Sequence, residues 1–199
     1  MVPEAALQIG LSSWIVQDGN YPDFVRGTTV EFALEAWVRS ADLADPGPIG
    51  YELVGEGGYR VRAQAVFVHE SAAAHEAVCV WDCGFVAYEE GRRTRPGLGY
   101  FVEGEFSFGV DPFFYSAEQS RRLPDMPGLL YEWEVQAIHL QTGPRVLSEK
   151  NVWERDASQS GWREIEATDA WNDDAGHASY LLTCVARSGP YKPPARLRA

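Results

Sequence analysis

The chain has 199 residues, of which 45% are hydrophobic, 13% aromatic and 23% charged. This composition is typical of a globular protein and excludes a chain that is wholly disordered, collagen-like or coiled-coil. The formal net charge of −12 disfavours a nucleic-acid partner, because affinity for a phosphate backbone comes mainly from Lys and Arg. No apolar run approaches the ~18 residues of a membrane span, and the first residues lack the pattern of a secretion signal, so we expect a soluble, cytoplasmic protein.

Alternation of apolar and polar side chains predicts β-strands along most of the chain. The period is two rather than 3.6, and it is clearest at 27–38, 59–68 and 131–140. In chain order the predicted strands are 7–16, 27–38, 49–54, 59–68, 77–88, 98–108, 131–140, 150–155, 161–166 and 179–186. Helix signals are limited to an Ala-rich stretch at 71–77 and a turn or two from Ser116 that ends before Pro124. The sequence therefore predicts an all-β protein.

The two halves of the chain repeat one order of features. A strand with an early Gly at 10–18 is followed by a loop and by the alternating strand at 30–36. Residues 104–111 and 131–137 show the same order. An internal duplication would explain this repeat. The general likeness of amphipathic strands explains it as well, because only two of the seven aligned strand residues are identical.

The predicted architecture is an antiparallel Greek-key barrel, and its domain division follows from the repeat. Two OB-like halves would cover residues 1–94 and 95–188, with the boundary in the charged stretch 91–97. A single ten-stranded barrel or sandwich is the alternative. Residues 189–199 are predicted to form a basic, Pro-containing tail that is solvated or lies against the acidic body of the protein.

Motifs of the common enzyme classes are missing from the sequence. There is no Gly-x-Ser-x-Gly nucleophile motif. The glycines at 55–58 lack the helix and the Lys of a nucleotide loop, so Gly57 and Gly58 are expected to form a hairpin turn and no cofactor is expected.

Three pairs of carboxylates lie on strands at a spacing that a glycosidase could use. Any alternating acidic strand has this spacing, so ion pairs across strands with Arg60 and Arg62 are the simpler interpretation. The pairs are Glu31 with Glu35, Glu103 with Glu105, and Glu132 with Glu134.

Two groups of residues have metal-ligand chemistry without the matching spacing. His69, His75, Cys79 and Cys83 are zinc ligands by type, but the two thiols would lie about 13 Å apart along one strand. Buried, reduced thiols are therefore expected, at Cys184 as well. The loop 18–23 lacks the terminal Glu of a calcium hand, and so no metal site is predicted.

The loop after the first strand of each half is the predicted ligand-binding site. Ligand-binding loops of small barrels gather at one end, and each of these loops combines aromatic and acidic side chains. The candidate residues are Asp18, Asn20, Tyr21, Asp23, Asp111, Phe113 and Tyr115. Four tryptophans also lie among acidic residues, where they either hold a ligand or are covered by other elements, namely Trp37, Trp153, Trp162 and Trp171.

These patterns predict a non-catalytic binding or protein-interaction module for a protein or small-molecule ligand. Two other functions stay open. An OB-like pair would bind single-stranded nucleic acid if Arg92, Arg93, Arg95 and the tail supplied a basic groove. A small hydrolase or isomerase would place His69 or His139 beside an acid in the barrel mouth.

Overall fold

A computed structural model gives the fold of the chain, and it describes residues 3, 5–70, 77–91, 97–147, 151, 153–156 and 158–194. Strands dominate, which confirms the all-β prediction. They are β1 (Leu7–Ser12), β2 (Thr29–Phe32), β3 (Leu34–Ala44), β4 (Gly50–Leu53), β5 (Gly58–Glu70), β6 (Ala77–Asp82), β7 (Val86–Gly91), β8 (Phe101–Val110), β9 (Leu130–Thr142), β10 (Arg145–Leu147), β11 (Trp153–Arg155), β12 (Gly161–Ile165) and β13 (Ser179–Tyr191). The short helical elements are α1 (Ser13–Gln17), the π-helical turn η1 (Tyr115–Gln119) with α2 (Ser120–Arg122), and the 3₁₀ turn η2 (Asp173–Gly176).

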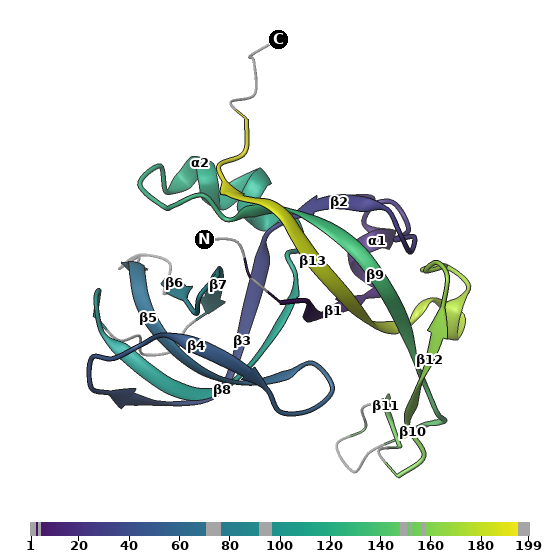
Figure 1. Cartoon of the computed structure of the whole chain (residues 1–199). Coiled ribbons are helices and arrows are strands. Elements are labelled where there is room, and N and C mark those ends of the chain that lie inside the picture. The colour runs from purple at the N-terminus through teal and green to yellow at the C-terminus, as the bar shows by residue number, and fades with distance from the viewer. Residues whose placement is uncertain are drawn as a thin grey trace.

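Five strands close a barrel in the order β3, β8, β5, β6 and β7, with β7 returning to β3 (Figure 1). The neighbouring strands are antiparallel except β3 and β7, which are parallel where Glu35 pairs with Tyr88. Along β5, Tyr59, Val61 and Ala63 are buried in the barrel while Arg60 is exposed, as the alternation predicts. β4 pairs with the first part of β5.

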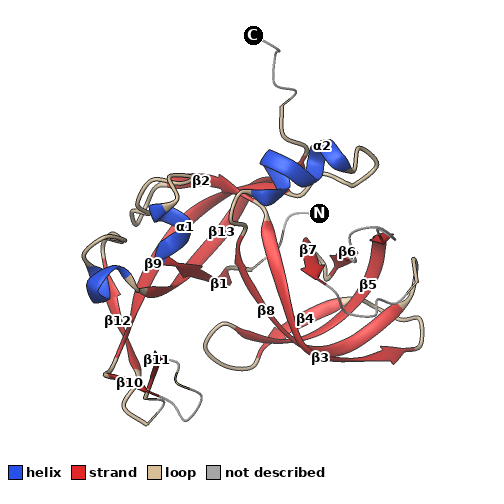
Figure 2. Cartoon of the chain, turned by 180° about the vertical axis from the view of Figure 1, so that it is seen from behind, coloured by secondary structure: helices blue, strands red, loops and turns tan. Residues whose placement is uncertain are grey.

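The remaining long strands form a second curved layer beside the barrel. β9 pairs with β13 along one edge, and with β2 and β12 along the other. β1 pairs with β13 and meets β8 through a parallel bridge between Gly10 and Gly109. The hairpin of β10 and β11 lies at the end of this layer that is far from α2 (Figure 2). A continuous hydrophobic core runs from the barrel interior into this layer.

The barrel draws on both sides of the predicted boundary, because β8 begins after residue 95 and pairs with β3 and β5. Each half does begin with a strand that leads through a short helix to another strand, β1 to β2 and β8 to β9. The division at 94/95 and the duplication stay predictions. β13 continues to Tyr191, so the first residues of the predicted tail pair with β9.

Several predicted strands have different limits in the structure. The strand predicted at 27–38 is divided at Ala33 into β2, which pairs with β9, and β3, which pairs with β8 and continues to Ala44. The strand predicted at 7–16 ends at Ser12, because Ile15 and Val16 become buried on the turn of helix α1. The strand predicted at 77–88 is two strands, since the chain reverses at Gly84, whose φ is +92°. The strand predicted at 150–155 is confined to β11, which pairs with β10, a strand that was not predicted. The predicted turns after Ser116 are η1 and α2, whereas residues 71–76 lie outside the described residues.

A second, smaller apolar cluster fixes the helical segment 115–122 on the outside of the barrel. Tyr88 and Val80 on the outer faces of β7 and β6 pack with Tyr115, Leu123 and Met126 of this segment and of the loop after it. The segment therefore covers the side of the barrel where β3 and β7 run parallel. None of the helices in the described part of the chain has the length and apolar character needed to cross a lipid bilayer.

Candidate functional site

The two predicted binding loops lie side by side. Nδ2 of Asn20 donates a 3.3 Å hydrogen bond to the carbonyl oxygen of Pro112. The rings of Tyr21 and Phe113 meet edge to face with their centroids 6.0 Å apart. Both loops start near the parallel bridge between β1 and β8, which explains why they reach the same place.

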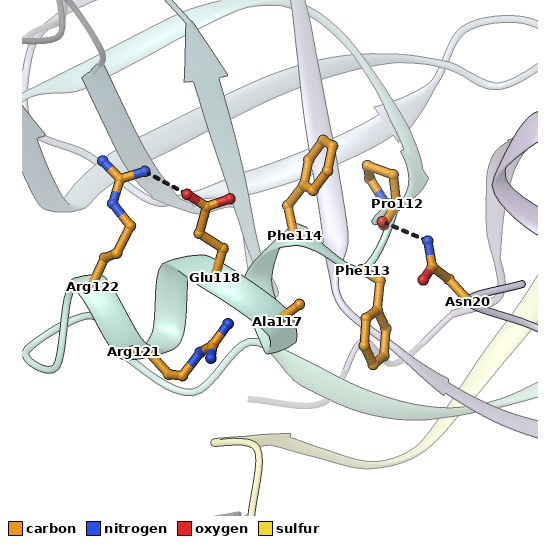
Figure 3. A pocket seen from close by; sticks show the side chains of 8 residues that line it. All are labelled: Asn20, Pro112, Phe113, Phe114, Ala117, Glu118, Arg121 and Arg122. Atoms are coloured by element: carbon orange, nitrogen blue, oxygen red, sulfur yellow. Dashed lines mark hydrogen bonds and ion pairs between the residues drawn. The ribbon is translucent and has the colours of Figure 1, made fainter. Parts of the chain in front are cut away.

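A groove of about 630 Å³ lies between these loops and the helical segment (Figure 3). The side chains of Phe113 and Phe114 point in opposite directions, and 46% of the surface of Phe114 is exposed. Arg122 forms a 3.0 Å ion pair with Glu118 one helical turn away. Arg121 is exposed, and its side chain forms no hydrogen bond or ion pair with any described residue. The lining residues are Asn20, Pro112, Phe113, Phe114, Ala117, Glu118, Arg121 and Arg122.

The backbone at the groove is held in an uncommon conformation. Phe113 has φ +73°, a left-handed value that is costly for a bulky side chain. The carboxylate of the buried residue Asp111 fixes the turn, because its Oδ1 accepts hydrogen bonds from the backbone N–H groups of Phe114 (3.1 Å) and Tyr115 (3.4 Å). The phenolic hydroxyl of Tyr88 donates to the same oxygen. Asp111 therefore holds the backbone of the groove wall in place, although Asp111 itself does not line the groove.

The buried Asp111 also lies close to two half-buried carboxyls, Glu35 and Glu90, which the sequence pattern does not bring together. Burial raises the pKa of Asp111 to about 6, although its three hydrogen bonds oppose this shift. Burial raises the pKa of Glu35 to about 7, although a hydrogen bond from the side chain of Trp37 lowers it. The nearby charges of Asp111, Glu90 and Glu89 raise this pKa further. Nε2 of Gln119 donates a 2.6 Å hydrogen bond to Glu90. We call Glu35, Glu90 and Asp111 the carboxyl cluster.

The other predicted loop residues have structural partners or lie apart from the groove. The carboxylate of Asp23 accepts hydrogen bonds from Oγ1 of Thr168 (2.7 Å) and from the backbone N–H of Ala170 (3.0 Å), which joins two loops. The hydroxyl of Tyr115 donates to the carbonyl of Pro127 at 2.7 Å. The side chain of Asp18 is exposed and does not line the groove.

The cysteines are buried free thiols, as the sequence predicts for Cys79, Cys83 and Cys184. Burial raises the pKa of Cys83 and of Cys184 well above the ordinary value of a thiol. His75 lies outside the described residues, and within the described ranges no group of three or more His, Cys, Asp or Glu side chains is placed to hold a metal ion.

The histidines proposed for a hydrolase are both half-buried. The imidazole of neither His69 nor His139 forms a hydrogen bond or an ion pair with a described residue, so this part of the structure adds no support to that alternative.

The basic residues proposed for nucleic-acid binding are only partly described. Arg92, Arg93 and Arg95 lie outside the described residues, as do Arg196 and Arg198 of the tail. Arg187 pairs with Glu134, and Nζ of Lys192 donates to the carbonyl of Pro124 at 3.0 Å. The tail therefore contacts the body of the protein where it is described.

Partners of the strand carboxylates and of the displaced tryptophans are also visible. Arg62 pairs with Glu103 across strands, as expected, whereas Arg60 pairs with Glu52 at 3.4 Å. The indole N–H of Trp162 donates to Glu56. Trp37 and Trp171 keep 42% and 66% of their surface exposed, and the side chain of Trp153 is outside the described part of the chain.

Comparison of the chain with protein-family models, with curated proteins and with solved structures gives no match. The fold and the site therefore define the protein as a β-barrel protein with a loop-bounded surface groove. Its function is inferred from the chemistry of its own residues.

Proposed function

We propose that this protein is a non-catalytic binding protein whose ligand lies in the groove between the Asn20 loop and the helical segment 115–122. The observation that carries the proposal is the meeting of two loops that are far apart in sequence, through Asn20 and Pro112, beside an exposed Phe114 and a free Arg121. Function commonly resides in loops that a rigid scaffold positions in this way. Glu118 is the one carboxylate among the described residues that line the groove, and it pairs with Arg122, which supports binding over acid–base catalysis.

The ligand that fits this groove best is a small carboxylic acid with an aromatic or aliphatic body. The volume of about 630 Å³ lies within the usual range for small-molecule sites. Phe114 offers an apolar surface, and Arg121 offers a guanidinium group that can hold a carboxylate through two parallel hydrogen bonds. The chain as a whole carries a net charge of −12, so a free Arg at this place favours an anion locally against the general charge.

A titration with N-acetyl-L-phenylalanine, followed by backbone amide NMR shifts, tests the proposal. At about −0.3 kcal/mol per non-hydrogen atom, this probe should bind with a Kd on the order of 1 mM. The largest shifts are expected at residues 113–122. N-acetyl-L-phenylalanine amide has the same ring without the carboxylate, and it should bind several-fold more weakly.

Two variants and one control separate the contributions. Phe114→Ala should weaken both probes, whereas Arg121→Gln should remove the preference for the acid over the amide. Arg163→Gln is the matched control, because Arg163 is also exposed and forms no ion pair with a described residue but lies on β12. Equal affinity for acid and amide in the native protein, or shifts that both groove variants leave unchanged, would contradict the proposal.

A further inference from the structure

The carboxyl cluster lies under the part of the chain that shapes the groove. Segment 111–122 is attached to β7 at two polar points, Tyr88 to Asp111 and Gln119 to Glu90. The rings of Tyr88 and Tyr115 also pack, with their centroids 6.4 Å apart. A change of charge in the cluster therefore acts directly on the attachment of the groove wall.

Two buried acceptor atoms in this attachment have no hydrogen-bond donor among the described residues. They are Oδ2 of Asp111 and Oε1 of Gln119, on side chains whose residues are 0% and 2% exposed. An unpaired buried acceptor costs free energy. A carboxylate can only accept hydrogen bonds, whereas a protonated carboxyl also donates one. A proton bound by the cluster would thus supply a donor at a place where acceptors are in excess.

The charges around the cluster are of one sign. Asp111 interacts with Tyr88 and Glu90 from β7, with Glu35 from β3, with Tyr115 from η1 and with Tyr21 from the loop after α1. Glu89 and Glu90 act on Glu35 in addition. None of the largest influences on Asp111 or Glu35 comes from a Lys, Arg or His. Full ionisation of the cluster therefore places the like charges of one buried and two half-buried carboxylates close together, which is unfavourable.

We propose that the carboxyl cluster is a proton-operated switch that regulates the groove: segment 111–122 packs firmly on β7 when the cluster holds a proton, and loosens when the cluster is fully ionised. Regulation of ligand binding by the cluster rests on the proposed function, because segment 111–122 forms one wall of the groove. Burial and like charge raise the pKa of Glu35 to about 7 and that of Asp111 to about 6, so the change of state falls near neutral pH.

Hydrogen exchange of the full chain without any ligand tests the switch. Exchange is followed by mass spectrometry at pH values of about 5.5, 7 and 8.5, and the rates are corrected for the intrinsic pH dependence of exchange. We expect amides of residues 112–122 to be protected about tenfold or more better at the lowest pH than at the highest. Amides in the middle of β9 exchange through global unfolding, so their protection should follow the global stability and change with pH no more than that of residues 112–122.

Neutral variants show whether the cluster is responsible. In the double variant Asp111→Asn, Glu35→Gln the protection of residues 112–122 should become independent of pH. Glu105→Gln is the matched control, since Glu105 is an exposed carboxylate on β8 whose removal should leave the native pH dependence. Native exchange that does not change with pH, or a pH dependence that survives in the double variant, would overturn the switch. The native pH series decides the question even if the double variant does not fold.

A ligand titration separates the switch from the proposed function. N-acetyl-L-phenylalanine should bind more tightly at pH about 5.5 than at about 8.5, because only the packed segment forms the groove. Equal affinity at both pH values would show that the cluster does not regulate the groove. A protein that shows the exchange switch but binds the probe at neither pH would refute the proposed function and leave the pH-dependent packing of the segment established.

Discussion

The indole ring of Trp37 fills the space in which residue 109 would carry a Cβ atom. A Cβ placed on Gly109 would lie 2.5 Å from Cη2 and 2.8 Å from Cζ2 of Trp37. Gly109 is also the residue through which β8 meets β1 at Gly10. The ring thus covers the junction of the barrel and the second layer, which gives a structural reason for an aromatic side chain on the acidic face of β3.

The first prediction concerns this junction. Gly109→Ala should lower the free energy of unfolding by about 1–3 kcal/mol, as overpacking of a filled site does. Gly10→Ala is the control, because its Cβ would lie 3.4 Å from Trp37 and 3.6 Å from the carbonyl of Phe108, which requires little movement. Urea unfolding measures both. Equal losses in the two variants would contradict the fit of Trp37 on Gly109, and Trp37→Leu should restore much of the stability lost by Gly109→Ala.

Long strands with one buried and one solvent-exposed face were predictable from the sequence. The alternation at 59–68 and 131–140 identifies β5 and β9, because a strand with one buried face keeps period two on each side of a bulge. Helix α1 was missed, since five residues contain too few turns to show a helical period. The two-strand reading of 77–88 was missed because Gly84 follows a nearly continuous apolar run.

Only part of the candidate site could be predicted. The two loops do lie side by side, because β1 and β8 meet at Gly10 and Gly109, whereas ligand binding by these loops stays a prediction. The carboxyl cluster could not be found in this way. Glu35 lies at a polar position of an alternating strand, which predicts exposure. It is half-buried where β3 pairs with β7, a contact that the local pattern does not encode.

The hairpin at Gly57 and Gly58 gives the second prediction. The backbone N–H of Val54 donates a hydrogen bond to the carbonyl of Gly58, which confirms the expected turn. Within this turn Gly57 has φ +67°. The N–H of Gly57 donates to Oε1 of Gln8 at 2.8 Å, and a Cβ on Gly57 would lie 2.9 Å from Leu181. Gly57→Ala should therefore destabilise the protein by about 1–2 kcal/mol.

Gly55→Ala is the matched control for this turn, because nothing lies within 4 Å of a Cβ at Gly55. Thermal unfolding of the two variants should show a lower Tm for Gly57→Ala alone. A comparable drop for Gly55→Ala would mean that the glycines act through chain flexibility and not through the left-handed turn.

The third prediction is a pH dependence of global stability. The pKa of Asp111 is raised from 3.8 to about 6 in the folded protein, so the folded state binds more protons than the unfolded state between these values. Its contribution therefore favours folding below pH about 4 and is lost as the pH rises through about 6, a change of about 3 kcal/mol at about 1.4 kcal/mol per pKa unit.

Asp111→Asn removes this contribution without removing the acceptor Oδ1. The difference in unfolding free energy between the native protein and Asp111→Asn should shift in favour of the variant as the pH is raised from about 4 to about 8. Urea titrations at several pH values measure this difference, and Glu105→Gln serves again as the exposed control. If the difference in unfolding free energy stayed constant with pH, or shifted in favour of the native protein, the prediction would be contradicted. The hydrogen bonds to the Asp111 carboxylate would then stabilise its charged form by as much as, or more than, burial destabilises it.

The fourth prediction tests how Tyr21 supports the groove. Its ring packs against Phe24, Phe32 and Phe113 at centroid distances of 6.0, 6.5 and 6.0 Å, while its hydroxyl forms no hydrogen bond with any described residue. Tyr21→Phe should therefore change the unfolding free energy by less than about 0.5 kcal/mol, and Tyr21→Ala should lower it by about 3–5 kcal/mol. Since Phe113 would lose its neighbour, Tyr21→Ala should also weaken N-acetyl-L-phenylalanine binding under conditions where the variant is folded. Equal destabilisation by the two substitutions would mean that the hydroxyl, and not the ring, holds the two loops together.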